Sequence, residues 1–299
     1  MRPGELDVVI ATRERWAVLE RTLSALRGQS VSGFRTVIVC DGTDQDVPPR
    51  LRRSVGSFLV QEQAGLAAAR NRGVAASEAP LVLFLGDDMI PGSDLVERHL
   101  ERHDAEPGEG VGVLGRTEWH QAVAGRRLER WLAFSGAEFD YRDPSLAEFE
   151  SFSSDNVSLS RAVFEAVGGF DESLRSGYED LELGRRLGQH GMRLAYEPRA
   201  IARHLHRHDW EAIIARFRGH AKGERLMASR FDWFTPRYRE RIEAAAAAPA
   251  VSPVWISLAQ LTPPWPRGVR SGVRKRADRW YLQQLAEPFL AAWDDAGAR

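Results

Sequence analysis

The sequence predicts an α/β fold with a mostly parallel central sheet flanked by helices, followed by a helical C-terminal appendage. Over the first ninety residues, short β-branched runs alternate with segments whose apolar residues recur at helical spacing. Such strand–helix–strand alternation implies right-handed crossovers, which make neighbouring strands parallel. The composition, with 43% hydrophobic and 28% charged residues, is that of an ordinary globular chain.

The first expected strand is the β-branched run at 7–11. A helix follows it, because Trp16, Leu19, Leu23 and Leu26 recur at spacings of three and four residues. Further strands are expected at 34–40, 58–61 and 80–85, and an alanine-rich helix is expected at 65–77.

Beyond residue 90 the same patterns continue. Helices are expected at 95–103, 161–167, 180–190 and 210–230, and around 244–248. Strands are expected at 111–119, 156–160, 193–196 and 200–206. We therefore expect one domain over residues 1–230. Residues 231–299 form the appendage, which Pro249, Pro253, Pro263, Pro264 and Pro266 make irregular.

Composition and charge exclude several classes of protein. The single cysteine, Cys40, rules out an internal disulfide framework and suits a reducing compartment. The net charge of −1 argues against a general nucleic-acid binder. No apolar run has the length of a transmembrane helix, and no signal-peptide core precedes the first strand. We expect a cytoplasmic protein.

Polar side chains follow three of the expected strands, at the point where each strand ends. They are Thr12, Arg13 and Glu14 after the first strand, Asp41 after the second, and Asp87 and Asp88 after the strand at 80–85. Ligands bind at the carboxyl ends of such strands, so these groups are expected to converge on one site. Paired carboxylates suit Mg²⁺ or Mn²⁺, with substrate phosphates completing the shell. Asp also ends strands without any function, which is the alternative for each residue alone.

A second set of candidates lies further along the chain. Glu179 and Asp180 begin a helix, where they either cap it or, kept ionised by its dipole, serve as a general base. His204, His206 and His208 alternate, so in a strand all three would point to one face. One of them is a candidate metal ligand, and a solvated or capping histidine is the alternative.

Other residues carry no expected function. His99 and His103, four residues apart among charged residues, are expected on a solvated helix face. Cys40 is expected to be a small core residue. Gly110, Gly112 and Gly115 spell a dinucleotide fingerprint, but they lie within a strand pattern and open no helix.

Several motifs occur in an order that resembles the inverting family 2 glycosyltransferases, which have the GT-A fold. The resemblance covers roughly residues 6–220 and rests on the segments 8–15, 39–43, 65–73, 83–88, 156–160, 168–171 and 179–180. The segment 65–73, Gly-Leu-Ala-Ala-Ala-Arg-Asn-Arg-Gly, is the most specific. The chain departs from the family pattern at three positions. Ala11 replaces a proline, Cys40 an aspartate, and Gly86 the first aspartate of an Asp-x-Asp motif.

The resemblance implies a role for each matching residue. Residues 1–90 would be the donor half of the domain and 110–210 the acceptor half. Thr12, Arg13, Glu14, Asp41, Arg70 and Asn71 would hold the nucleotide, Asp87 would face the ribose or donor sugar, and Glu179 would contact substrate. Asp88 would bind the divalent cation, Mn²⁺ or Mg²⁺, with His204 as the third metal-side residue and His206 as its alternative. Asp180 would be the base that deprotonates the acceptor hydroxyl.

The implied partners are a nucleotide-diphosphate sugar and an acceptor that is a glycan, a lipid-linked intermediate or a small molecule, as in polysaccharide biosynthesis. Two other functions stay open. A catalytically inactive nucleotide-sugar binding protein would not need Asp88, Asp180 and His204. A sugar nucleotidyltransferase would show a Gly-rich basic phosphate loop near the first strand, which residues 12–14 do not resemble.

The stretch 267–279 carries six basic residues against one acidic residue, a balance of +5, and Trp265 and Trp280 flank it. Basic residues beside interfacial tryptophans favour peripheral contact with an anionic bilayer. The alternative is an ordinary solvated helix that packs Trp280, Leu282 and Leu285 against the main domain.

Overall fold

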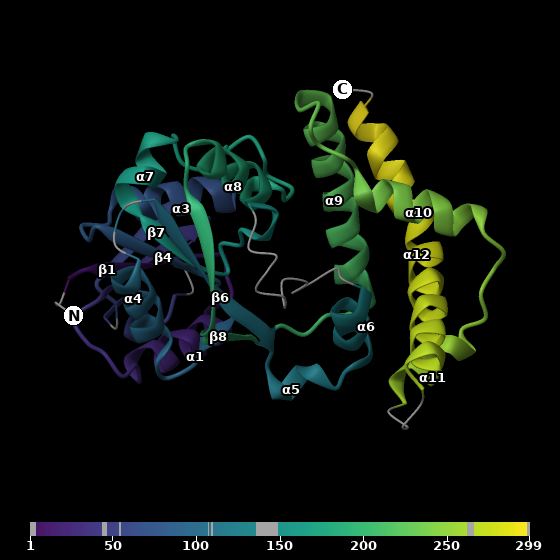
Figure 1. Ribbon diagram of the computed structural model, residues 1–299, viewed down its shortest axis with the longest axis horizontal. Helices are drawn as coiled ribbons and strands as arrows, with labels where there is room; N and C mark the ends of the chain where they lie inside the picture. Colours follow the sequence, from purple (N-terminus) through teal and green to yellow (C-terminus); the bar gives the residue numbers. More distant parts are fainter. Residues whose placement is uncertain are drawn as a thin grey trace. The chain divides into compact units, whose positions relative to one another are not determined.

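The computed structural model describes residues 4–43, 47–53, 55–106, 108, 110–135, 149–261 and 266–297 (Figure 1). Contacts divide the chain into two compact units. The first comprises residues 1–120, 141–175 and 179–206, and the second comprises 121–140, 176–178 and 207–299. This division differs from the expected boundary after residue 230, because helix α9 (Trp210–Arg230) groups with the C-terminal helices.

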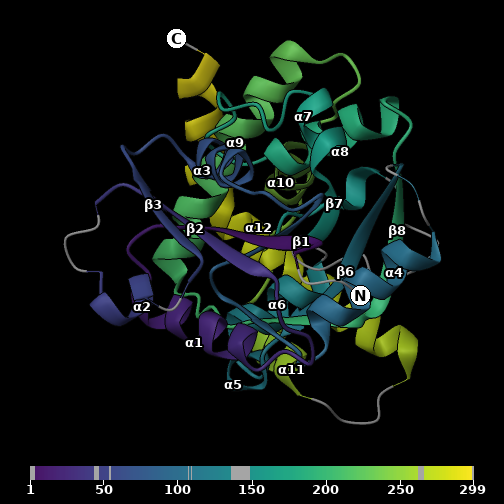
Figure 2. The ribbon, with the colours of Figure 1, turned by 90° about the vertical axis from the view of Figure 1, so that its left-hand side faces the viewer.

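An eight-stranded sheet with the order β3-β2-β1-β4-β7-β6-β8-β5 forms the centre of the first unit (Figure 2). Its strands are β1 (Leu6–Thr12), β2 (Arg35–Asp41), β3 (Ser57–Gln61), β4 (Leu81–Leu85), β5 (Met89–Pro91), β6 (Val111–Trp119), β7 (Asn156–Ser160) and β8 (Arg193–His204). Strands β1 to β4 pair in parallel with one another, and β6 pairs in parallel with β8. Strand β7 is antiparallel to both of its neighbours, and β5 is antiparallel to β8. The sheet is mixed, with parallel pairs in the majority as predicted.

Helices flank this sheet. They are α1 (Trp16–Arg27), α2 (Pro49–Arg53), α3 (Leu66–Ala75), α4 (Leu95–Ala105), α7 (Arg161–Ala166) and α8 (Glu179–Gln189). The predicted apolar face of α1 is confirmed, since Leu19, Leu23 and Leu26 are all buried. Helix α3 packs closely on β1 at Gly73, where a Cβ atom would lie only 2.4 Å from Val9 Cγ1. Cys40 is a buried core residue of β2, as expected.

The prediction of two separate strands at 193–196 and 200–206 was wrong. Strand β8 is continuous, with a register shift against β6 between Gly115 and Arg116. Pro198 lies at this irregularity, where it cannot donate a ladder hydrogen bond. The strand also ends at His204, so His206 and His208 follow it in irregular backbone rather than sharing a strand face with it.

The expectation that His99 and His103 face solvent was wrong as well. His99 is completely buried, with Nδ1 2.8 Å from Ser158 Oγ and Nε2 3.0 Å from Asn156 Oδ1. His103 Nε2 lies 2.8 Å from the same hydroxyl. Burial lowers the pKa of each imidazole to about 4, so both are neutral at pH 7. Their charged neighbours in the sequence suggested a solvated face, but the two imidazoles belong to a buried polar network that links α4 to β7.

The second unit is helical and is built around α12 (Arg267–Gly297). This helix packs against α6 (Arg127–Ser135), α9, α10 (Arg237–Ala247) and α11 (Val254–Gln260), and α5 (Gln121–Ala124) precedes α6. At its centre Trp131 stacks on Tyr281, with ring centroids 4.3 Å apart, and donates from Nε1 to Asp278 at 2.9 Å. The helical character of the appendage is confirmed, and α10 ends at Ala247, just before Pro249, as expected. No helix within the described ranges is both long and apolar enough to span a membrane.

Candidate active site

Asp88 and His204 meet at the edge of the sheet where β4 and β8 end. The short strand β5 pairs Met89 with His204, and the Leu205 N–H donates to the Asp88 carbonyl at 2.8 Å. These backbone contacts bring His204 Nε2 to 3.0 Å from Asp88 Oδ2. His206 Nδ1 lies 3.6 Å from the same oxygen, and its ring stacks on that of His204. His204 and His206 therefore converge on Asp88, whereas the backbone N–H of His208 donates to Glu129 Oε1 at 2.8 Å in the second unit.

The guanidinium of Arg15 bridges the two adjacent carboxylates. Its Nη2 lies 2.8 Å from Asp88 Oδ2 and also contacts Asp87, to which Nε donates at 3.2 Å. Thr12 at the end of β1 donates from Oγ1 to Asp87 at 2.7 Å. Arg15 is a residue of the loop after β1 to which the sequence analysis assigned no role. It completes an edge where Thr12, Asp87 and Asp88 come together as predicted.

Electrostatics couples Asp88 to His204. Burial alone would raise the pKa of Asp88, but the hydrogen bond from His204 and the charges of His204 and Arg15 outweigh it and lower that pKa. Burial also acts to lower the pKa of His204, and the hydrogen bond and charge of Asp88 outweigh it and raise that pKa. The pair is therefore stabilised as carboxylate and imidazolium.

Asp155 is a carboxylate at this edge that the sequence analysis missed. It precedes β7, which runs antiparallel to β4, so the start of β7 lies beside the end of β4. A Cβ atom built on Gly86 would lie 3.1 Å from Asp155 Oδ1 and 3.4 Å from Asp88 Oδ1. Burial, together with the charges of Asp88 and Asp180, raises the pKa of Asp155 to about 6. The sequence places Asp155 directly before an expected strand, but no local pattern shows that this strand runs antiparallel to β4.

Asp180 lies in the first turn of α8, as predicted. Its Oδ2 accepts a hydrogen bond from the Ser154 N–H at 3.1 Å. Its Oδ1 is buried and has no hydrogen-bond partner among the residues that the structure describes. The neighbouring Glu179 accepts from Arg70 Nη1 at 2.9 Å, and both of these side chains are buried. Arg70 thus joins α3 to the start of α8.

Asp41 is buried at the end of β2, where it supports the loop that leads into α3. Its Oδ1 accepts from Gln61 Nε2 at 2.9 Å and from the Ala64 N–H at 2.7 Å, and its Oδ2 accepts from the Gly65 N–H at 2.9 Å. Gly65 has a φ of 105°, which few other residues adopt readily. The carboxylate therefore holds the most specific sequence motif in place.

The structure also places the three remaining candidates. Asn71 accepts from the Phe170 N–H at 2.8 Å and donates to the Phe170 carbonyl and to Glu172, so it holds the segment 170–172 beside α3. Arg13 and Glu14 are exposed in the loop after β1. Glu14 has a φ of 54°, an uncommon conformation for a residue with a side chain.

The side chains at the edge fit a divalent cation by their chemistry. Asp88 and Asp155 offer hard carboxylate oxygens and His204 an imidazole nitrogen, a donor set that suits Mn²⁺ or Mg²⁺. Gly86 has no side chain, and a Cβ atom there would crowd both carboxylates. As placed, no three His, Cys, Asp or Glu side chains of the described ranges already surround one point as ligands. Arg15 instead provides the cation beside Asp88.

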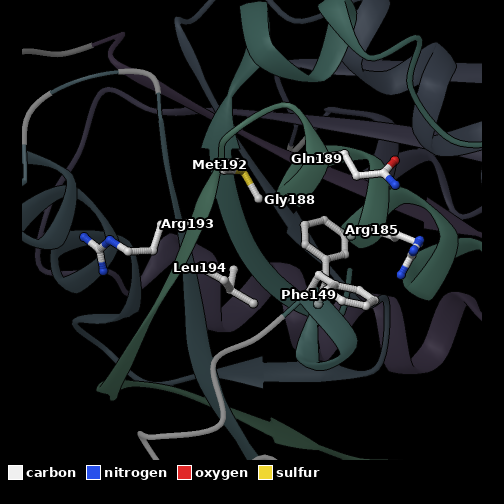
Figure 3. Close-up of a pocket in the computed structure, with 9 residues that line it drawn as sticks. Phe149, Arg185, Gly188, Gln189, Met192, Arg193 and Leu194 are labelled. Carbon is white, nitrogen blue, oxygen red and sulfur yellow. The ribbon is translucent and has the colours of Figure 1, made fainter.

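A separate pocket of about 470 Å³ lies elsewhere in the first unit (Figure 3). It is lined by Phe149, Phe152, Gly184, Arg185, Gly188, Gln189, Met192, Arg193 and Leu194. Arg193 and Leu194 begin β8, whereas His204 ends it, so the pocket lies toward the opposite edge of the sheet. It contains none of the site candidates.

Comparison with known proteins identifies the family. The model of the family described as "Glycosyltransferase like family 2" matches residues 3–220. The chain belongs to this family. Validoxylamine A glucosyltransferase of Streptomyces hygroscopicus subsp. jinggangensis (strain 5008) is 34% identical over 223 residues, covering 62% of this chain and 52% of that protein. Pre-mycofactocin glycosyltransferase of Mycobacterium tuberculosis (strain CDC 1551 / Oshkosh) is 32% identical over 232 residues, covering 73% and 47%. The chain spans about half the length of these curated relatives.

Comparison with solved structures shows that this chain has the GT-A fold. The mannosyltransferase PcManGT from Pyrobaculum calidifontis, in complex with GDP-Man and Mn²⁺, aligns with a TM-score of 0.61 at 17% identity, covering 98% of this chain and 86% of that one. TarS 1-349 from S. aureus, in complex with UDP, aligns with a TM-score of 0.54 at 13% identity, covering 96% and 91%.

Proposed function

We propose that this family 2 glycosyltransferase transfers a sugar from a nucleotide-diphosphate sugar to an acceptor hydroxyl, with inversion of the anomeric centre. The observation that carries the proposal is the gathering of Thr12, Asp87, Asp88 and His204 at one sheet edge, beside Asp155 and Asp180. One end of such a site can hold a diphosphate, and the other can activate a hydroxyl. The relatives named above carry the names of sugar transferases, which supports a transfer of this kind.

The donor nucleotide is proposed to bind over the ends of β1 and β2. Arg13 and Glu14 are exposed there, and Thr12 and Asp87 are joined by a hydrogen bond next to them. Asp41 supports this region by holding the backbone N–H groups of Ala64 and Gly65, and Asn71 is proposed to line the same pocket. In this proposal they shape the pocket in addition to any direct contact with the nucleotide.

A divalent cation is proposed to be held by Asp88, Asp155 and His204, with His206 as an alternative to His204. When bound, it would neutralise charge on the departing diphosphate. For His204 to act as a ligand, its imidazole must lose the proton that Asp88 favours. Arg15 must also release Asp88, and its guanidinium is then free to contact phosphate oxygens, which it can bind with two hydrogen bonds.

Asp180 is proposed to be the general base. Its Oδ2 is held by the Ser154 N–H, which orients the carboxylate, and Oδ1 has no hydrogen-bond partner among the described residues. Removal of that proton as the acceptor oxygen attacks the anomeric carbon makes the reaction a single displacement. Such general-base assistance typically contributes about 10²–10⁴-fold to the rate. Glu179 is tied to Arg70 and is proposed to contact substrate rather than to take the proton.

A thermal-shift panel tests the proposal. UDP-, GDP- and dTDP-sugars are each added to the full chain with Mn²⁺, with Mg²⁺ or with EDTA. One nucleotide class should raise the melting temperature, because a ligand at 100 times its dissociation constant stabilises a protein by about 2.7 kcal/mol. The selected donor is then offered with glycan, lipid-linked and small-molecule acceptors. Binding of a donor without turnover on any of them would support an inactive binding protein instead.

A further inference from the structure

The strongest remaining feature is a surface of the second unit formed by α11 and the first half of α12. We define it as the α11–α12 surface, comprising Val254, Leu261, Val269 and the six basic residues of the stretch 267–279. Figure 1 shows α11 beside this part of α12, and the two helices are in contact. We propose that the α11–α12 surface binds an anionic lipid bilayer.

The basic residues of this surface are displayed rather than buried. They are Arg267, Arg270, Arg274, Lys275, Arg276 and Arg279, and all six are exposed. The inner face of the same helix segment consists of Val273 and Ala277, which are buried. The one acidic residue, Asp278, accepts from Trp131 at 2.9 Å and from Arg241 at 3.1 Å. Its carboxylate is therefore already paired with residues of α6 and α10. It does not pair with the six exposed basic side chains in these contacts.

Exposed aliphatic side chains accompany these charges. Across the described ranges only four large hydrophobic residues are strongly exposed, and three of them belong to this surface. Val254 is 51% exposed, Leu261 55% and Val269 51%. Positive charge attracts anionic headgroups. Aliphatic side chains that enter the acyl boundary behind the headgroups add favourable free energy, because their apolar surface leaves water. A soluble polyanion offers no apolar layer, so the aliphatic residues favour a bilayer as the partner.

Aromatic rings hold the surface in shape. The guanidinium of Arg276 lies over the Trp255 ring at 4.8 Å, which joins the two helices. Arg274 lies over Phe134 of α6 at 5.5 Å. Trp280, at the end of the basic stretch, is half-buried. Trp265, which precedes the stretch in the sequence, lies outside the described residues.

Vesicle co-sedimentation of the full chain tests the proposal. The protein should sediment with vesicles of phosphatidylcholine mixed with phosphatidylglycerol, and not with phosphatidylcholine alone. Binding should be strong at about 0.01 M salt and weak at about 1 M, as the Debye length falls from about 30 Å to about 3 Å. No binding to the mixed vesicles at low salt, or equal binding to both compositions, would overturn the proposal.

Two matched double variants test whether vesicle binding depends on this surface or only on the total positive charge of the protein. Arg270→Gln with Lys275→Gln should lower the partition coefficient about 25-fold, since each basic residue near such a surface contributes about fivefold. Arg27→Gln with Arg53→Gln removes two exposed charges from the first unit and should change it little. Equal losses in the two double variants would contradict a specific surface.

A second pair of variants tests whether the exposed aliphatic side chains contribute to vesicle binding. Leu261→Ser should lower partition at least about threefold, whereas Leu66→Ser, at 47% exposure outside the surface, should not. Equal effects of these two variants would overturn bilayer contact. A competing duplex DNA should fail to displace the protein from mixed vesicles, and efficient displacement would assign the surface to polyanions instead. Sedimentation does not depend on turnover, so these outcomes are independent of the proposed transfer reaction.

Discussion

His204 Nε2 lies 3.0 Å from Asp88 Oδ2, although 116 residues separate them in the chain. The short strand β5 creates this proximity, because it begins directly after Asp88 and pairs Met89 with His204. Arg15 adds a third charge to the pair. Backbone pairing at the end of β8 thus brings this candidate metal-side pair together.

Asp88→Asn should weaken Mn²⁺ binding at least about tenfold, because an amide oxygen is a poorer ligand for a hard cation than a carboxylate. Titration of Mn²⁺ followed by electron paramagnetic resonance measures this without any substrate. Asp104→Asn removes an exposed carboxylate of α4 and should leave the affinity unchanged. If the wild type binds the selected nucleoside diphosphate equally well with Mn²⁺ and with EDTA, the metal assignment fails.

Asp180→Asn should reduce transfer by about 10²–10⁴-fold while donor affinity stays within a few-fold. The amide keeps a hydrogen-bond acceptor for the Ser154 N–H but cannot take a proton. Asp209→Asn is the matched control, since Asp209 caps α9 by accepting from the Ala212 N–H at 2.7 Å. Turnover measured with the donor from the panel should not change in the control. A variant of Asp180 that melts earlier but turns over normally would show a capping role alone.

Gly86→Ala should lower Mn²⁺ affinity and turnover by about tenfold or more, since small misplacements of site groups are costly. The added methyl group would lie 3.0 Å from Met89 Cγ and 3.1 Å from Asp155 Oδ1, so the carboxylate must move. Gly125→Ala is the control, because nothing lies within 4 Å of its Cβ position. Melting temperatures of both variants report any unfolding. Wild-type Mn²⁺ affinity in the Gly86 variant would argue against Asp155 as part of the cation site.

Stability should fall as the pH drops from 6.5 toward 4, because of the buried imidazole of His99. Its pKa is lowered to about 4 by burial, so the unfolded state takes up the proton first and is favoured in this window. Protonation of His99 alone should lower the free energy of unfolding by about 2 kcal/mol between pH 7 and pH 5. Urea unfolding at the two pH values measures the difference. His99→Gln should reduce the pH dependence without abolishing it, because burial also lowers the pKa of His103 to about 4. His190→Gln, at an exposed position, should leave the dependence unchanged.

The sequence alone predicts the parts of this protein whose signals are local. Apolar periodicity predicted α1 and α9, β-branched runs predicted β1 and β2, and the order of the motifs predicted the family and its fold. Thr12 and Asp87 were expected to meet, because each follows a strand of the same parallel sheet, and they share a hydrogen bond. These features depend on spacing within a dozen residues and on one general rule of sheet geometry.

Only the tertiary structure placed the groups whose environment is made by distant segments. Asp155 joins the site because β7 runs antiparallel, a direction that no local pattern specifies. Arg15 bridges Asp87 and Asp88, and His99 is buried against β7, although each lies among polar neighbours in the sequence. Burial and long-range pairing depend on which surfaces meet after folding. They decide whether a charged or polar side chain becomes a solvated residue, a buried structural partner or part of a site.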